Sequence, residues 1–190
     1  MNATQIDDLC ESLSSPTARV RYGAAKALRG VAAQAPEALY PRFDFFARML
    51  DGDNRIFRWN ASRILGSLAA ADREDKIGKL FDHFFAPILG HELITAANVI
   101  QAAADIAEAK PELADRIAGE VMKVKRANYA TPECRNVAIG HALTSLRRMY
   151  PHLGNKKPVL AFVRAQVDNP RPAARKRAAE FLACVERTRG

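Results

Sequence analysis

Residues 39–69 read LYPRFDFFARMLDGDNRIFRWNASRILGSLA, two helix-like segments joined by a short turn that contains Asp and Asn. In both segments apolar residues recur at three- and four-residue steps, the spacing of one face of an α-helix. The second segment, FRWNASRILGSLA, aligns without a gap with VRYGAAKALRGVA at residues 20–32, so that Arg58 falls on Arg21. The chain therefore contains the same helical segment at least twice.

The alignment continues with three further segments: TAANVIQAAADIA (95–107), CRNVAIGHALTSL (134–146) and ARKRAAEFLACVE (174–186). Successive segments are offset by 37, 38, 39 and 40 residues, counted at the anchor positions Arg21, Arg58, Ala96, Arg135 and Arg175. A period near 40 residues that contains two helices is typical of a stacked helical solenoid. Each unit of such a stack buries its apolar face against its neighbours.

Helix signals recur along the whole chain, whereas alternating strand patterns do not. Pro-Glu pairs at Pro36, Pro111 and Pro132 mark helix starts, because proline in the first turn loses no needed N–H group. We predict ten helices, at 4–13, 16–34, 37–50, 54–71, 73–89, 91–109, 111–126, 133–149, 153–168 and 170–188. Short connections predict a single domain, 1–190, with units near 1–35, 36–72, 73–110, 111–150 and 151–190.

With its early proline, its Asp/Asn turn and its Arg-led, Ala-rich second helix, the 39–69 segment resembles the HEAT repeat. The resemblance covers most of the chain, although Ala96 replaces the arginine in the third unit and the fourth unit has an atypical first helix. It implies an all-α, right-handed α-solenoid of about five antiparallel helical hairpins, with the second helix of each unit on the concave face. The HEAT repeat has an arginine at the start of its second helix, and the resemblance implies that this arginine pairs with turn acids of neighbouring repeats. In this chain the position is occupied by Arg21, Arg58, Arg135 and Arg175.

The charge of the chain is concentrated on the second, inner helices. The 190 residues include 29 Lys and Arg against 21 Asp and Glu, a net charge of +8. The inner helices hold 16 of these cations and 6 of the acids, a net of +10, over residues 16–34, 54–71, 91–109, 133–149 and 170–189. Such an excess favours acidic partners, although a solvated basic face without a specific partner is the alternative.

Two aromatic residues lie on the side of the inner helices that points away from the expected core. In the first unit the buried stripe is expected to consist of Val20, Ala24, Leu28 and Val31. Tyr22 lies two residues after Val20, about 200° around the helix, and Trp59 holds the same place in the second unit. For Trp59 the alternative is that it packs into a groove between helices.

Basic residues accompany these aromatics on the same side: Lys26 and Arg29 in the first unit and Arg63 in the second. Exposed Trp and Tyr beside Arg are typical of hot spots in protein interfaces, and also of platforms on which nucleic-acid bases stack. The candidate binding residues are therefore Tyr22, Lys26, Arg29, Trp59 and Arg63.

No catalytic, metal-binding or cofactor-binding motif is evident. GxGxxG, GxxxxGK[ST] and HExxH are absent, and the four histidines lack metal-ligand spacing. The three dispersed cysteines predict buried, reduced thiols. With no signal-peptide pattern at the N-terminus and no apolar run of about 18 residues, we expect a cytoplasmic protein.

These observations predict a non-catalytic binding or scaffold protein whose basic concave face binds an acidic protein or peptide. Nucleic acid is the alternative ligand. A HEAT-like fold also occurs in bacterial DNA glycosylases that act on alkylated bases, so the resemblance admits an enzyme. Those enzymes need a catalytic carboxylate among several aromatic residues, and the first two inner helices contain no acidic residue. The oligomeric state is left open.

Overall fold

The protein is helical throughout the part that the structure describes. This computed structural model describes residues 1–187, and no strand occurs among them. The prediction of an all-α fold is thus confirmed. The chain divides into two compact units, residues 1–84 (unit 1) and residues 85–190 (unit 2). The predicted single domain stays a prediction.

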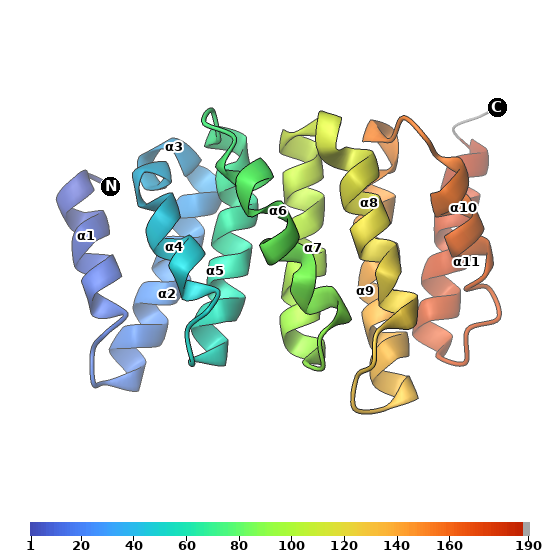
Figure 1. The fold of residues 1–190 in the computed structure, drawn as a ribbon, viewed down its shortest axis with the longest axis horizontal. Helices are drawn as coiled ribbons and strands as arrows, with labels where there is room; N and C mark the ends of the chain where they lie inside the picture. The colour runs from blue at the N-terminus through green and yellow to red at the C-terminus, as the bar shows by residue number, and fades with distance from the viewer. Residues whose placement is uncertain (188–190) are drawn as a thin grey trace. The chain divides into compact units, whose positions relative to one another are not determined.

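Unit 1 is built around two adjacent long helices (Figure 1). Its α-helices are α1 (Ala3–Ser12), α2 (Ala18–Gln34), α3 (Pro36–Leu39), α4 (Phe43–Met49), α5 (Arg55–Leu68) and most of α6 (Lys76–Phe85). α2 packs along α5, while α1 packs on α2 and α4 packs on α5. The two inner helices of the first and second predicted units, α2 and α5, therefore lie side by side.

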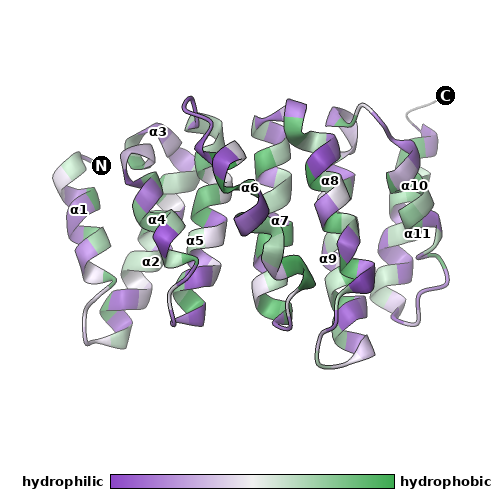
Figure 2. Ribbon diagram, viewed as in Figure 1, coloured by the Kyte–Doolittle hydropathy of each residue, from purple (hydrophilic) through white to green (hydrophobic). Residues whose placement is uncertain are grey.

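Unit 2 has two layers of helices (Figure 1). Its α-helices are α7 (Leu93–Ala109), α8 (Ala114–Met122), α9 (Pro132–Met149), α10 (Lys157–Arg164) and α11 (Pro172–Arg187). α9 packs between α7 and α11 to form the inner layer, and α8 and α10 pack against that layer. Figure 2 shows that α7 is mostly hydrophobic, and ten of its residues are buried.

Small residues on the inner helices are deeply buried. Ala24, Ala61, Ala138 and Ala178 are at most 4% exposed, as expected for close packing of helix axes. The predicted stripe of the first inner helix is wrong at its start, since Val20 is 45% exposed. The first three residues of α2, 18–20, are exposed, and the first buried residue of the helix is Ala24. Val31 is half-buried.

The ten predicted helices occur close to their expected places, with interruptions at prolines. Tyr40–Arg42 (η1) and Ala86–Leu89 (η3) are 3-10 turns that contain Pro41 and Pro87. Proline has no N–H group to continue the α-helical hydrogen bonds. The segments 37–50 and 73–89 are therefore not continuous α-helices. The predicted end of the last helix, residue 188, lies outside the described residues.

Most of the phenylalanines between residues 43 and 85 lie in the hydrophobic core. Phe43, Phe46, Phe81, Phe84 and Phe85 are at most 2% exposed. Phe45 is half-buried.

None of the helices described is long and apolar enough to cross a membrane.

Candidate functional site

The inner helices of unit 1 carry cations and no carboxylate. Neither Ala18–Gln34 (α2) nor Arg55–Leu68 (α5) contains an Asp or Glu. On α2, Lys26 and Arg29 are exposed, and neither makes an ion pair or side-chain hydrogen bond with residues 1–187. Arg63 on α5 is half-buried. The adjacent pair of helices is therefore a positively charged surface with cations available to a partner.

The two candidate aromatic residues differ in exposure. Tyr22 on α2 is 39% exposed, and its ring reaches α5, where it meets the edge of Phe57 with 6.3 Å between ring centroids. The guanidinium of Arg21 lies 5.8 Å from the centre of the Tyr22 ring. Trp59 is half-buried rather than exposed, because α5 is the more enclosed of the two helices. Tyr22 is thus the aromatic side chain that a ligand reaches most readily.

The arginines at the repeat anchor positions bind backbone carbonyl groups. Arg21, Arg135 and Arg175 each donate to carbonyl oxygens in the turn that precedes their own helix. For Arg135 the acceptor is the Ala127 carbonyl, at 2.8 Å from Nε. For these three, the expected pairing with turn acids of neighbouring repeats is wrong. A guanidinium with several donors suits the unpaired carbonyls of a tight turn as well as it suits a carboxylate.

Unit 2 has a second basic surface on its inner layer, which the sequence reasoning did not single out. A cavity of about 100 Å³ between α9 and α11 is lined by Leu143, Thr144, Arg147, Arg177 and Glu180. Arg147 and Arg177 are both exposed. Arg177 lies over the buried Gly140, so close that a Cβ there would be 2.6 Å from Nη1. In the sequence, the only indication of this second basic surface is the net charge of the two segments, +2 for residues 133–149 and +4 for residues 170–189.

His141 is half-buried beside this basic surface. Burial lowers its pKa, and the nearby cations of Arg177 and Arg171 lower it further. Arg171 is itself paired with Glu133. Its surroundings therefore favour the neutral imidazole over the protonated form.

Two of the other histidines, His83 and His91, contact polar groups of neighbouring segments. His83 pairs with Asp51 at 3.0 Å, and both are exposed. His91 Nδ1 lies 3.2 Å from the Asn128 carbonyl oxygen. All three cysteines are free and half-buried rather than buried as predicted; they are Cys10, Cys134 and Cys184. Within residues 1–187 no group of three His, Cys, Asp or Glu side chains could hold a metal ion.

Comparison with known proteins gives matches in structure only. No protein-family model matches the chain, and no curated protein matches its sequence. A crystal structure of an engineered protein is similar with a TM-score of 0.54 and 15% identity, covering 98% of this chain and 85% of the other. A designed armadillo repeat protein in complex with the peptide (KR)4 is similar with a TM-score of 0.55 and 15% identity, covering 92% and 79%.

At this level of identity the likeness concerns the fold alone. It confirms the predicted fold class, an α-solenoid of helical repeats. The HEAT type of repeat stays a prediction.

Proposed function

We propose that this protein is a non-catalytic, HEAT-type binding scaffold of the cytoplasm, which binds an acidic segment of a partner protein on the inner helices of unit 1. The residues that make the contact are Tyr22, Lys26, Arg29, Trp59 and Arg63. The observation that carries the proposal is the absence of any carboxylate on α2 and α5, beside the exposed cations Lys26 and Arg29. Complementary charge steers a ligand to such a surface and selects against like-charged partners.

The designed armadillo repeat protein supports peptide binding as a use for this fold, since its complex holds (KR)4. That peptide is basic. The cations of α2 and α5 would repel it, so we expect the ligand of this protein to have the opposite charge. Tyr22 adds an exposed aromatic ring of the type that dominates interface energies.

Nucleic acid is the second candidate ligand, because the exposed ring of Tyr22 with Arg21 beside it could stack on a base. Salt dependence alone does not separate the two, since both ligands are anionic. Single-stranded nucleic acid gives a log–log slope of about −0.7 for each neutralised phosphate. An acidic peptide of defined sequence depends instead on single hot-spot residues.

The test is an anisotropy titration of the full chain with a labelled polyglutamate peptide and with a labelled single-stranded oligonucleotide, at several salt concentrations. The variants are Arg29→Glu and Tyr22→Ala. Arg73→Glu is the matched control, since Arg73 is exposed in the turn before α6 and its reversal changes the net charge equally. Peptide binding that is lost in Arg29→Glu and retained in Arg73→Glu supports the proposal. Binding of the oligonucleotide alone replaces it with the nucleic-acid function.

A further inference from the structure

A groove lies on the outer layer of unit 2, away from the inner helices. It has a volume of about 680 Å³, within the range of about 300–1,000 Å³ typical of ligand clefts. It runs between α8 with the following 3-10 turn η5 (Lys123–Arg126) and α10. Its lining residues are Gly119, Met122, Lys123, Lys125, Arg126, Pro158, Ala161, Phe162, Ala165 and Gln166. We call it the α8–α10 groove.

A hydrogen-bonded contact joins the start of α8 to the loop before α10. The Asp115 carboxylate on α8 accepts hydrogen bonds from the Asn155 N–H, in the loop before α10, at 3.1 and 3.2 Å. The lining residues come from the later part of α8 with η5, residues 119–126, and from residues 158–166, which begin in the first turn of α10.

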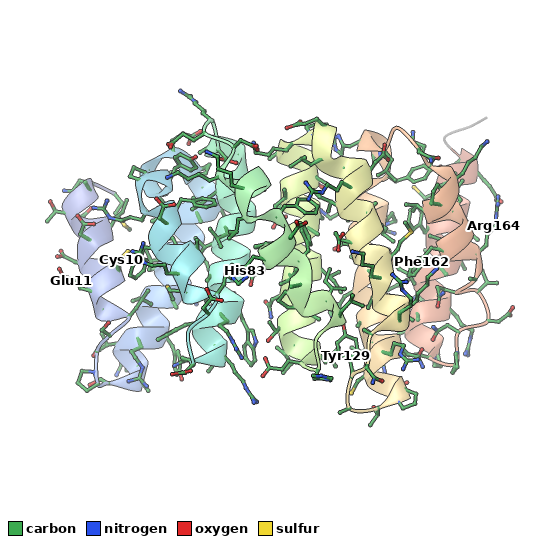
Figure 3. The ribbon with its side chains drawn as sticks, in the orientation of Figure 1. Cys10, Glu11, His83, Tyr129, Phe162 and Arg164 are labelled. Atoms are coloured by element: carbon green, nitrogen blue, oxygen red, sulfur yellow. The ribbon has the colours of Figure 1, made fainter. Side chains whose placement is uncertain are left out.

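The wall formed by α10 is apolar. Pro158, Ala161, Phe162 and Ala165 recur at the spacing of one helix face. Phe162 is only 5% exposed at the base of the groove, whereas Pro158, Ala161 and Ala165 are exposed above it. Figure 3 labels Phe162 together with Arg164, which lies about 200° further around α10. Arg164 is exposed and does not line the groove.

The wall formed by α8 and η5 is basic. The groove is lined by Lys123, Lys125 and Arg126 and by no carboxylate. Lys123 is paired with Glu120 at 2.6 Å. Lys125 and Arg126 are exposed, and neither has an ion-pair partner among residues 1–187. An apolar wall thus faces two cations that are available to a partner.

We propose that the α8–α10 groove is a docking site for a short, acidic, amphipathic helix of a partner protein. The apolar side chains of the partner helix pack on Ala161, Ala165 and Phe162, and the carboxylates of that helix pair with Lys125 and Arg126. The apolar wall from residue 158 to 165 spans about 10 Å of helix, so the occupant contributes about two turns. An apolar helix face laid into a groove is a recurring mode of peptide recognition. This site is separate from the inner surface of unit 1, and it does not rest on the proposed function.

The test uses the full chain and a labelled peptide in which leucine recurs at helical spacing among glutamates. A peptide with glutamine in place of every glutamate is the charge control. We expect the affinity measured by anisotropy to fall about tenfold in the double variant Lys125→Glu/Arg126→Glu. In this variant the peptide carboxylates are repelled by two glutamates where they were attracted by two cations. Ala161→Asp, which places a charge on the apolar wall at an exposed position, should weaken binding to a similar extent.

Arg164→Glu is the matched control, on the same helix and outside the groove, and it should change binding less than twofold. Circular dichroism of each variant verifies that the helices are retained. Equal weakening in Arg164→Glu, or equal binding of the glutamine peptide, would overturn the proposal. So would selective binding of a single-stranded oligonucleotide at these residues. If Arg29→Glu abolishes binding of this peptide while the groove variants do not, this inference fails and the proposed function stands. If the groove variants weaken binding and Arg29→Glu does not, this inference stands, and the polyglutamate titration decides the proposed function separately.

Discussion

Arg21 and Arg175, near opposite ends of the sequence, make the same two hydrogen bonds. In each case Nη1 donates to the carbonyl oxygens of the residues six and five positions earlier. The distances for Arg21 are 2.8 Å to Ser15 and 2.9 Å to Pro16. Those for Arg175 are 2.8 Å to Asn169 and 3.0 Å to Pro170. The repeat thus preserves a turn clamp, in which an arginine of the inner helix holds an X-Pro turn in front of it.

Removing this clamp should destabilise the protein. Arg21→Met keeps much of the side-chain stem and deletes both hydrogen bonds, so we expect a loss of about 1–3 kcal/mol in the free energy of unfolding. Arg19→Met is the control, because Arg19 is exposed in the same turn of α2 and should cost less than about 0.5 kcal/mol. Urea denaturation measures both. Equal values for the two variants would show that the clamp does not contribute to stability.

Self-similarity in the sequence identified these arginine positions, but not their acceptors. The alignment reports spacing along the chain, whereas the acceptor depends on how the turn folds back onto the guanidinium. Exposure was harder to predict for the same reason. The helical period gives the direction of Val20 and Trp59, but not how far α1 covers α2 or how deeply α5 is enclosed. The contact of the Arg177 guanidinium with Gly140 is made between two helices, α11 and α9. Such a contact leaves no local pattern in the sequence.

The stability of the protein should decline at alkaline pH through Tyr129. Its hydroxyl donates to the Ile88 carbonyl at 2.7 Å, and burial raises its pKa to about 12. The ordinary value is about 10. The folded state therefore favours the neutral phenol, and this contribution is present below pH 10 and is lost between about pH 10 and 12.

Tyr129→Phe should cost about 1 kcal/mol near neutral pH, from the lost hydrogen bond, and should show a shallower decline above pH 10. Part of the decline should remain, because burial and the hydrogen bond to Asp72 also raise the pKa of Tyr40. Urea denaturation across this pH range is the measurement. An unchanged pH dependence in Tyr129→Phe would contradict the assignment.

His141 should report on the basic surface between α9 and α11. Burial, then Arg177 and Arg171, lower its pKa below the ordinary value, so its contribution to stability is present above about pH 6.5 and is lost as the pH falls. Arg177→Gln removes one of the two cations and should raise the pKa of His141, as followed by NMR of the imidazole. In the control Arg147→Gln the change should be smaller. A His141 pKa that does not move in Arg177→Gln would exclude the cation as a cause.

The central claim, that α2 and α5 bind an acidic partner, is tested most directly by the fluorescence of Trp59. It is the only tryptophan of the chain and lies half-buried on α5, so its emission reports on this surface without a label. On titration with polyglutamate peptide at low salt, we expect a saturable change in Trp59 emission. The change should be lost in Lys26→Glu/Arg29→Glu and retained in Arg73→Glu. Binding detected by anisotropy with no change in Trp59 emission would place the ligand elsewhere and contradict the claim.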